Sequence, residues 1–407
     1  MRERSRQRKR HWSGLEKTWD RKWEGLHPSH FHVKTPPYLS PLEAHVTNRL
    51  LDRIQGCLLG AQIGDAMGMP WEGMKAHDIA HVTKGLGVMG FTAPGQHSLS
   101  FLRGLNAGDT TDDWALAAAN ARALIRGGGN YIPRLIVLEH LIAFRQSSIG
   151  WGRTTKKAME ELDAYEQTQH ILGRGPGSTA SMDQDRPNSG CGNGVAMKIA
   201  PLAIRHVTRH RGSRCDQLAK TVLRHGSLTH PDVRASVAAL GVAFLTTRFL
   251  LSSDDTFPEG SSAAAYEMLD HIRIRLASIE DEIASPPDSG RFTQRLGRIL
   301  DARQRDLLNP NKRQVKTADL VRVLGNGYHA LESCAFAIAM ALRHPNDFRS
   351  ALLNTVNAGG DADTNASMVG AMVGARVGLS GIPEEWRTFS PNFQEAIELA
   401  NQLYALK

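Results

Sequence analysis

Glycine recurs at every fourth position in two widely separated stretches of this sequence. The first stretch contains Gly56, Gly60, Gly64 and Gly68, and the second contains Gly370, Gly374 and Gly378. A spacing of four places such residues on one face of an α-helix, although each glycine costs about 1 kcal/mol relative to alanine. Glycine gives a neighbouring backbone room to approach closely. The sequence therefore predicts two central helices that pack tightly against their neighbours.

Most of the chain beyond residue 50 has the composition and spacing of α-helices. Stretches rich in Ala and Leu, with Gly or Pro at their edges, lie at 113–126, 133–146, 194–206, 232–250, 263–284, 291–308, 328–343 and 364–379. Alternating Val, Ile and Thr runs, which indicate β-strands, are scarce. We therefore predict an all-α fold. The stretch 263–318 is more polar than its surroundings, and we expect a solvent-facing helical insertion there.

The composition excludes several classes of protein. Hydrophobic residues make up 41% of the 407 residues and charged residues 22%, which is typical of a globular chain. No apolar run reaches the roughly 18 residues of a membrane span. The four cysteines are far apart, which excludes a disulfide scaffold and a zinc ribbon. We expect a protein of a reducing compartment, the cytoplasm.

The excess positive charge lies in an N-terminal arm. Residues 1–34 hold ten Lys or Arg and four Asp or Glu, which accounts for six of the eight excess positive charges. Nucleic-acid binding is therefore not favoured for the body of the protein. Trp12, Trp19 and Trp23 fall at helical spacing in this arm. They predict a short amphipathic helix that packs on the body, docks a protein partner or binds an anionic surface. We divide the chain into this extension, 1–45, and one domain, 46–407.

Two polar clusters stand where helices are expected to begin. The first contains Asp109, Thr111, Asp112 and Asp113, and the second contains Asp361, Asp363 and Thr364. Thr and Asp are ordinary helix caps, so capping is one interpretation of each cluster. Neighbouring carboxylates repel one another, however, and a divalent cation removes that repulsion. Hard oxygen ligands suit Mg²⁺ or Mn²⁺. Two such helix starts facing each other would form a two-metal site.

Four further features are candidate substrate contacts. Glu72 follows Pro70, just past the expected end of the first glycine-bearing helix, where a lone glutamate is commonly solvated. The glycine-rich loop 188–194 precedes a helix and could present backbone N–H groups to a diphosphate, although its spacing fits neither a Rossmann fingerprint nor a P-loop. His230 could be a cap, a core histidine or a ligand contact, and Tyr328 could stack on a base or a ribose.

In this order, the motifs resemble those of the ADP-ribosylglycohydrolase family. The matching segments are 56–72, 111–113, 192–198, 229–231, 325–328 and 359–364, and the resemblance covers roughly residues 50–390. It implies a compact, orthogonal multi-helix bundle with two divalent cations, Mg²⁺ or alternatively Mn²⁺. Two positions depart from the family pattern: Trp114 stands where many members have threonine, and Lys198 stands where many have arginine.

The resemblance also implies roles for individual residues. The metal ligands would be Thr111, Asp112, Asp113, Asp361, Asp363 and Thr364. The substrate contacts would be Ser189, Gly190, Cys191, Gly192 and Asn193 with His230 at the diphosphate, and Tyr328 at the nucleotide. The acid or base would be Glu72, Asp112 or Asp361, a choice that the sequence leaves open.

The implied activity is hydrolysis of the bond at C1″ of ADP-ribose on a modified protein. An arginine guanidinium is the first choice of leaving group, and serine-linked ADP-ribose and O-acetyl-ADP-ribose are the alternatives. The same domain could instead serve as an immunity protein against an ADP-ribosylating toxin, with the basic arm docking the toxin. A silent ADP-ribose-binding module is a further alternative, which the complete set of implied ligands disfavours.

Overall fold

The structure is a computed structural model, and it describes most of the chain beyond residue 45. The described residues are 46–96, 98–147, 150–172, 190–258, 262–283, 290–301, 306–309, 311 and 316–406. Within these ranges all regular secondary structure is helical, apart from two isolated β-bridges, so the predicted all-α class is confirmed. The arm 1–45 lies outside the described residues, and the expectations for it stay predictions.

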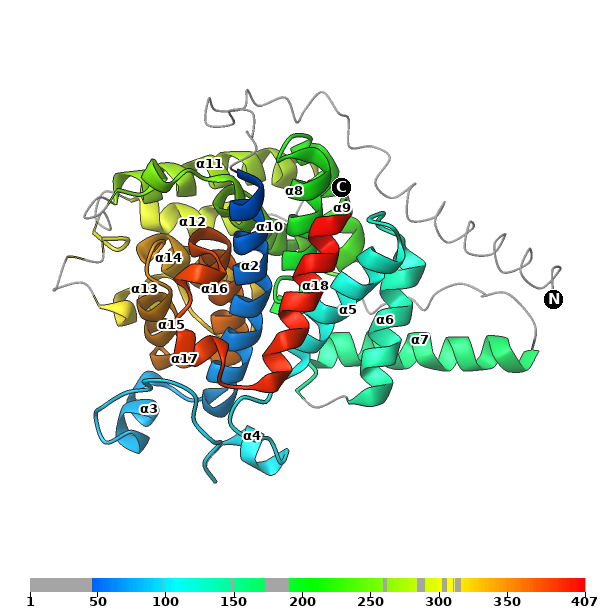
Figure 1. The fold of residues 1–407 in the computed structure, drawn as a ribbon, viewed down its shortest axis with the longest axis horizontal. Coiled ribbons are helices and arrows are strands. Elements are labelled where there is room, and N and C mark those ends of the chain that lie inside the picture. The colour runs from blue at the N-terminus through cyan, green and yellow to red at the C-terminus, as the bar shows by residue number, and fades with distance from the viewer. Residues whose placement is uncertain are drawn as a thin grey trace.

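Two antiparallel helices form the centre of the fold. They are α2 (Val46–Gly68) and α16 (Ala362–Val377), and α2 runs through the middle of the molecule in Figure 1. Gly60 faces Gly370 so closely that a Cβ added to either would lie 2.0 to 2.1 Å from the carbonyl oxygen of the other. The predicted tight packing is confirmed, and the partner of each glycine stripe is the other stripe. This backbone contact fixes how the two helices lie against each other.

Further helices surround this pair. The helices α10 (Val233–Leu251) and α14 (Ala330–Arg343) pack against α16, while α5 (Asp112–Arg126) and α18 (Gln394–Ala405) pack against α2. The other helices are α3 (Ala76–Val82), α4 (Leu99–Leu102), α6 (Pro133–Gln146), α7 (Arg153–Leu172), α8 (Ala200–His210), α9 (Cys215–Gly226), α11 (Ala263–Glu282), α12 (Phe292–Leu300), α13 (Thr317–Leu324), α15 (Phe348–Asn357) and α17 (Glu384–Arg387). By length and composition α10 could cross a membrane, but 89% of its apolar stretch is buried inside the fold, as expected for a core helix.

Two expected helices have different bounds in the structure. The helix expected at 194–206 is α8, which begins only at Ala200, after a short 3₁₀ turn at Asn193–Val195. Pro201 explains the late start, because proline is accepted in the first turn of a helix and not in its interior. The helix expected at 291–308 is α12, which ends at Leu300.

The polar stretch 263–318 is joined to the main core through its apolar faces. In α11, Leu269 and Leu276 are fully buried, and Phe292 and Leu296 are fully buried in α12. These side chains belong to the same hydrophobic cluster as the central helices. The two helices are therefore amphipathic, and the buried carboxylate of Glu280 on α11 accepts the N–H of Phe292 at 2.7 Å where α12 begins.

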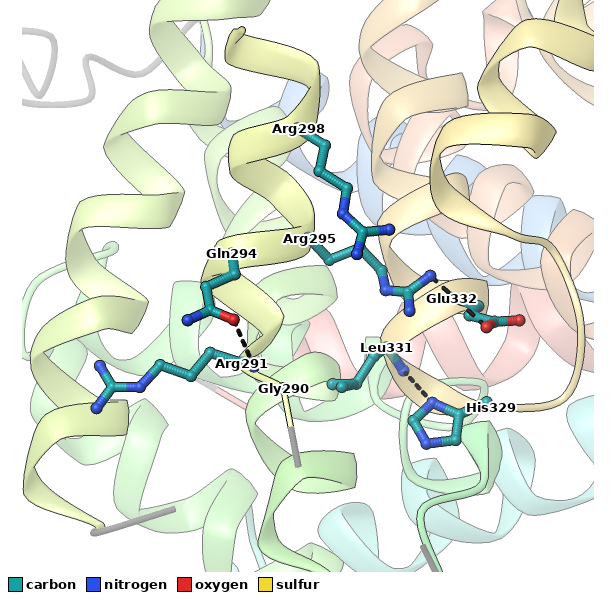
Figure 2. A pocket seen from close by; sticks show the side chains of 8 residues that line it. All are labelled: Gly290, Arg291, Gln294, Arg295, Arg298, His329, Leu331 and Glu332. Atoms are coloured by element: carbon teal, nitrogen blue, oxygen red, sulfur yellow. Dashed lines mark hydrogen bonds and ion pairs between the residues drawn. The ribbon is translucent and has the colours of Figure 1, made fainter. Parts of the chain in front are cut away.

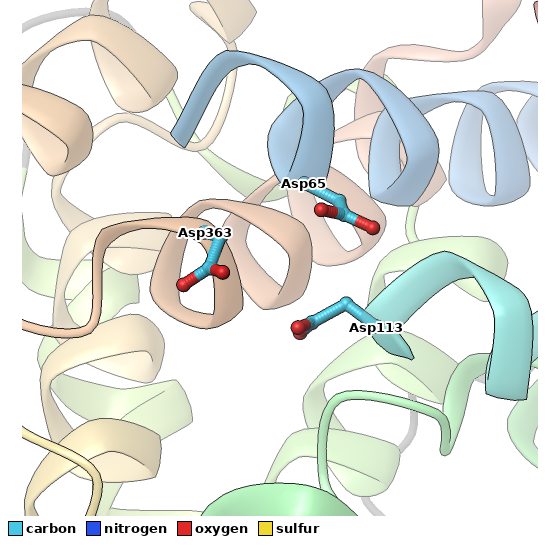
Figure 3. Close-up of side chains that lie close together, drawn as sticks. All are labelled: Asp65, Asp113 and Asp363. Atoms are coloured by element: carbon cyan, nitrogen blue, oxygen red, sulfur yellow. The ribbon is translucent and has the colours of Figure 1, made fainter. Parts of the chain in front are cut away.

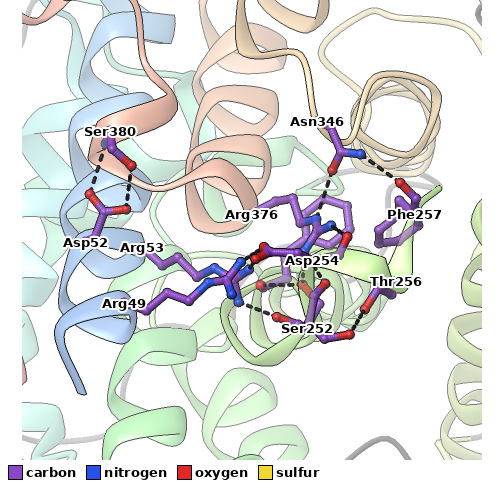
Figure 4. Close-up of polar contacts among 12 residues, drawn as sticks. Arg49, Asp52, Arg53, Ser252, Asp254, Thr256, Phe257, Asn346, Arg376 and Ser380 are labelled. Atoms are coloured by element: carbon purple, nitrogen blue, oxygen red, sulfur yellow. Dashed lines mark hydrogen bonds and ion pairs between the residues drawn. The ribbon is translucent and has the colours of Figure 1, made fainter. Parts of the chain in front are cut away.

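Arginines hold the other end of the central pair, where α2 begins and α16 ends (Figure 4). Arg376 donates hydrogen bonds to the carbonyl oxygens of Ser253 at 2.6 Å and Asp254 at 2.8 Å, just past the end of α10. Arg53 of α2 donates to the carbonyl oxygen of Leu250 at 3.3 Å. The Arg53 bond satisfies a carbonyl group that the end of α10 leaves without an intrahelical partner, and the Arg376 bonds hold the segment that follows. The arginines therefore anchor the central pair to α10.

Candidate functional site

The opposite end of the pair, where α2 ends and α16 begins, is shaped by loops that bond to one another. Gly73 donates its N–H to the carbonyl of Gly360 at 2.8 Å, and Gly360 donates to the carbonyl of Met74 at 2.7 Å. Gly360 has φ of +75°, in the region that favours glycine. These bonds hold the segment after α2 against the segment before α16. They set where the first residues of α16 lie.

Three carboxylates from three helices meet at this end. Asp65 of α2, Asp113 of α5 and Asp363 of α16 each offer an oxygen, and these oxygens all lie within 4.8 Å of one another. Figure 3 shows the three side chains directed into one space. All three residues are buried, and Oδ1 of Asp113 has no hydrogen-bond partner among the described residues. Three buried carboxylates grouped in this way, one of them with an oxygen that has no donor, fit a divalent cation.

Two threonines link these carboxylates. Thr111 is the N-cap of α5, and its Oγ1 lies 3.0 Å from Oδ1 of Asp65 and 3.2 Å from Oδ2 of Asp113. Thr364 donates its hydroxyl to the same Asp113 oxygen at 3.2 Å. Asp65 also accepts the backbone N–H groups of Thr111 and Trp114. The start of α5 is thereby fixed to α2.

Asp361 and Asp112 lie beside this cluster. Asp361 is the N-cap residue of α16, but its side chain makes no capping bond and instead accepts the amide N–H of Asn193 at 2.5 Å. Asp112 is the first residue of α5 and is buried. Asp109, from the same acidic stretch of sequence, instead accepts hydrogen bonds from Asn106. The structure thus brings together the predicted carboxylates and separates Asp109 from them.

Burial and mutual repulsion raise the pKa values of these acids. Burial raises the pKa of Asp65 and of Asp112 to about 7, and the pKa of Asp361 to about 6. Burial and the neighbouring carboxylates also raise the pKa values of Asp113 and Asp363. Without a cation, the cluster therefore favours protonated carboxyls in the folded protein near neutral pH.

Glu72 lies at the edge of the same space. It follows the 3₁₀ turn Met69–Trp71 that ends α2, so its predicted place past the helix is confirmed. Its side chain is 10% exposed and accepts a hydrogen bond from the guanidinium of Arg103 at 2.7 Å. Its charge contributes to the raised pKa values of Asp112, Asp361 and Asp363.

The predicted diphosphate loop lies next to the carboxylates. Asn193 joins it to Asp361, and its backbone N–H donates to the carbonyl of Tyr328 at 3.2 Å. Gly192 forms an isolated β-bridge with His329, and Ala330 donates its N–H to the carbonyl of Cys191 at 2.9 Å. Ser189 lies outside the described residues.

His230 and Tyr328 border this loop in different ways. His230 is buried under it: a Cβ added to Gly192 would lie 3.6 Å from Nε2 of His230. Burial and the charge of Lys198 lower the pKa of His230 to about 3, so the imidazole is neutral. Tyr328 is half exposed, and burial and three nearby carboxylates raise its pKa. His230 therefore lies on the buried side of the loop, and Tyr328 lies on its solvent-exposed side.

Sequence reasoning did not include Asp65 among the candidate ligands. The residue follows Gly64 in a helix of small and apolar residues, and it is fully buried. An acidic residue inside a glycine-striped helix needs a partner, because an isolated buried charge is unfavourable. The position of Asp65 inside this helix was therefore the sequence feature that could have indicated a functional role.

Lys198 is a second buried charge near the site. Its side chain is fully buried, and its Nζ has no hydrogen-bond partner among the described residues. Burial lowers its pKa to about 7, while the charge of Asp112 acts in the opposite direction. The residue that departs from the family pattern thus places a cation behind the carboxylates.

The geometry defines a class of protein: an all-α bundle with a buried carboxylate cluster that could hold a metal beside a glycine-rich loop. Residues 46–407 match the family model described as ADP-ribosylglycohydrolase. The chain belongs to the ADP-ribosylglycohydrolase family.

Several relatives share most of their length with this chain. It is 26% identical over 375 residues to the ADP-ribosylhydrolase ARH3 of Mus musculus, covering 88% of this chain and 92% of that protein. It is 27% identical over 365 residues to the uncharacterized protein YegU of Escherichia coli K12, covering 86% and 93%. A solved structure titled "ADP-ribosylglycohydrolase-related protein complex" superposes with a TM-score of 0.58 at 22% identity, covering 88% and 99%. The structural likeness supports the fold.

Proposed function

We propose that this protein is a metal-dependent hydrolase that releases ADP-ribose from modified protein side chains by cleaving the bond at C1″. The observation that carries the proposal is the convergence of Asp65, Asp113 and Asp363 within 4.8 Å, next to Asp361 and the loop that ends at Asn193. Family membership supports glycohydrolase chemistry.

The all-oxygen donors favour Mg²⁺, with Mn²⁺ as the alternative. The proposed ligands are the predicted set with Asp65 added: Asp65, Thr111, Asp112, Asp113, Asp361, Asp363 and Thr364. When bound, the cations would act as Lewis acids that stabilise charge at the reacting centre. The buried threonine and amide groups hold the carboxylates in place.

Proton transfer is assigned to the acids at the edge of the cluster. Glu72 is the most exposed of the predicted acids, and this supports it as the first candidate to protonate the leaving group. Asp361 and Asp112 are the other predicted candidates, but as proposed metal ligands they would be ionised when the cations are bound. The neutral His230 and the N–H groups of the loop would bind the diphosphate.

An arginine leaving group has one supporting observation. Glu72 already binds a guanidinium, that of Arg103, at 2.7 Å. The side chain of ADP-ribosyl-arginine carries the same group and could take this place. The relatives are named for ADP-ribosylhydrolase activity without a linkage, so the linkage must be measured.

The test is release of free ADP-ribose from three substrates: an arginine-modified protein, a serine-modified peptide and O-acetyl-ADP-ribose. Each is incubated with Mg²⁺, with Mn²⁺ or with a chelator. We expect release from the arginine substrate that needs a metal, is abolished in Asp361→Asn and persists in Asp109→Asn, whose side chain lies outside the cluster. Release from the serine substrate alone would show that the enzyme acts on serine-linked and not on arginine-linked ADP-ribose. No release from any of the three would contradict the function.

A further inference from the structure

A cavity lies next to the glycine-rich loop, which bonds to its lining residue His329. It has a volume of about 300 Å³ and is lined by residues of α12 and of the start of α14. The lining contains Arg291, Arg295, Arg298 and His329, against a single acidic residue, Glu332. A concave surface with this excess of positive charge attracts anions.

The arginines of α12 are held in place by backbone groups. Arg295 donates to the carbonyl of Leu324, and Arg298 donates to the carbonyl of Val323 at 3.2 Å. Figure 2 shows the Arg295 guanidinium reaching toward Glu332 with the Arg298 guanidinium beside it, whereas the Arg291 guanidinium extends away from His329. The carboxylate of Glu332 lies 3.6 Å from Arg295, so it occupies the position that an incoming anion would take. A planar guanidinium fork suits phosphate oxygens.

His329 adds a donor to the same cavity. Its Nδ1 accepts the N–H of Leu331 at 3.3 Å, which assigns the ring proton to Nε2. Burial and nearby arginines lower its pKa, so the ring is neutral at pH 7. The positive end of the α14 dipole lies at this point as well.

A continuous chain of contacts connects the cavity to the carboxylate cluster. Asp361 binds the amide of Asn193, Gly192 forms a bridge with His329, and His329 lines the cavity. A substrate with one ribose at the carboxylates and a diphosphate over the loop would direct its other nucleoside toward this cavity. This step rests on the proposed function.

We propose that the arginine cavity receives a phosphate group carried on the adenosine half of the substrate. The substrate class is ADP-ribose with an additional phosphate ester on its adenosine ribose, and Arg295, Arg298 and His329 are the contacts that recognise this ester. Glu332 leaves Arg295 when the ester binds.

The test compares the affinities of ADP-ribose and ADP-ribose 2′-phosphate by isothermal titration calorimetry. Charge-assisted hydrogen bonds predict that the wild-type protein binds the phosphorylated nucleotide about tenfold more tightly. The preference disappears in the double variant Arg295→Gln with Arg298→Gln, while the affinity for ADP-ribose is unchanged. The double variant Arg295→Lys with Arg298→Lys gives an intermediate preference, because lysine keeps the positive charge but cannot donate two parallel hydrogen bonds as a guanidinium does.

Arg322→Gln is the matched control, because Arg322 lies on α13, is 75% exposed and pairs with Asp319. It should keep the full preference. Equal affinities of the wild-type protein for the two nucleotides would overturn the proposal.

A titration with inorganic phosphate separates this proposal from the proposed function. If neither nucleotide binds but phosphate binds through Arg295 and Arg298, the cavity is an anion site and its link to adenosine is wrong. If ADP-ribose binds but neither inorganic phosphate nor the 2′-phosphate adds affinity through Arg295 and Arg298, the cavity proposal alone is overturned, whereas the hydrolase proposal is decided by the release assay.

Discussion

The two ends of the central helix pair differ in how their buried charged side chains are bonded: arginines lie at one end and carboxylates at the other. At one end, Arg376 donates four hydrogen bonds to groups of Ser252, Ser253, Asp254 and Asn346. At the other end, Asp113 keeps a buried oxygen without a hydrogen-bond partner among the described residues. Buried cations that donate to backbone carbonyls stabilise a fold. Buried carboxylates facing one another destabilise it unless a proton or a cation intervenes. We conclude that the arginine end stabilises the fold, whereas the carboxylate end is a candidate metal site that costs stability when it is empty.

The largest expected effect is on activity at the acidic end. Asp113→Asn should lower release of ADP-ribose at least about 100-fold, because it removes a charged ligand from the proposed metal site. In the presence of a chelator its melting temperature should not fall, since one repelling charge has been removed. Kinetics and thermal unfolding of the same preparation check both. A marked loss of stability in chelator would show that the carboxylate has a structural role.

Gly370→Ala should disturb both ends at once. The added Cβ would lie 2.0 Å from the carbonyl oxygen of Gly60, so the two helices must separate. We expect a loss of about 3 kcal/mol in the free energy of unfolding, measured with urea, and weaker metal binding. The control is Gly297→Ala in α12, where the nearest atom to an added Cβ is 3.9 Å away. That change should stabilise the protein slightly, because alanine favours the helix.

Arg376→Met tests the anchoring end alone. It removes the hydrogen bonds that Arg376 donates to the carbonyls of Ser253 and Asp254, and we expect a loss of about 2 kcal/mol in the free energy of unfolding. The kcat of the hydrolase should stay unchanged, because the substitution lies at the far end of α16. A fall in kcat under conditions in which the variant is fully folded would mean that the two ends are coupled.

The smallest effect is a pH-dependent gain in stability from a cation. The pKa values of Asp65 and Asp112 are raised to about 7, so the metal-free folded state favours their protonated forms. Their contribution to stability is present at low pH and is lost as the pH rises through about 7. Mg²⁺ should therefore raise the melting temperature by a few degrees at about pH 8 and hardly at about pH 5. An equal gain at both pH values would place the cation elsewhere.

Part of the candidate site was predictable because its residues mark helix starts. Thr111 and Asp113 open α5, and Asp363 opens α16, so their motifs could be found from local sequence alone. Asp65 was missed because it lies inside a helix, where its position in the glycine stripe indicates that it needs a partner but does not show whether that partner is a metal or a protein group. The start of α8 was misplaced because Pro201, in its first turn, sets where the helix begins, and the apolar residues of 194–199 do not.

The sequence by itself determined that the described chain is helical and that two helices allow a close backbone approach, since both properties depend on local spacing and on the missing side chain of glycine. It did not determine that the two glycine stripes face each other, because that pairing joins residues about 300 positions apart. Only the tertiary structure decided this. The antiparallel packing of α2 and α16 brings Asp65 next to Asp363 at one end and Arg53 near Arg376 at the other. The separation of anchor and candidate metal site follows from that one packing arrangement.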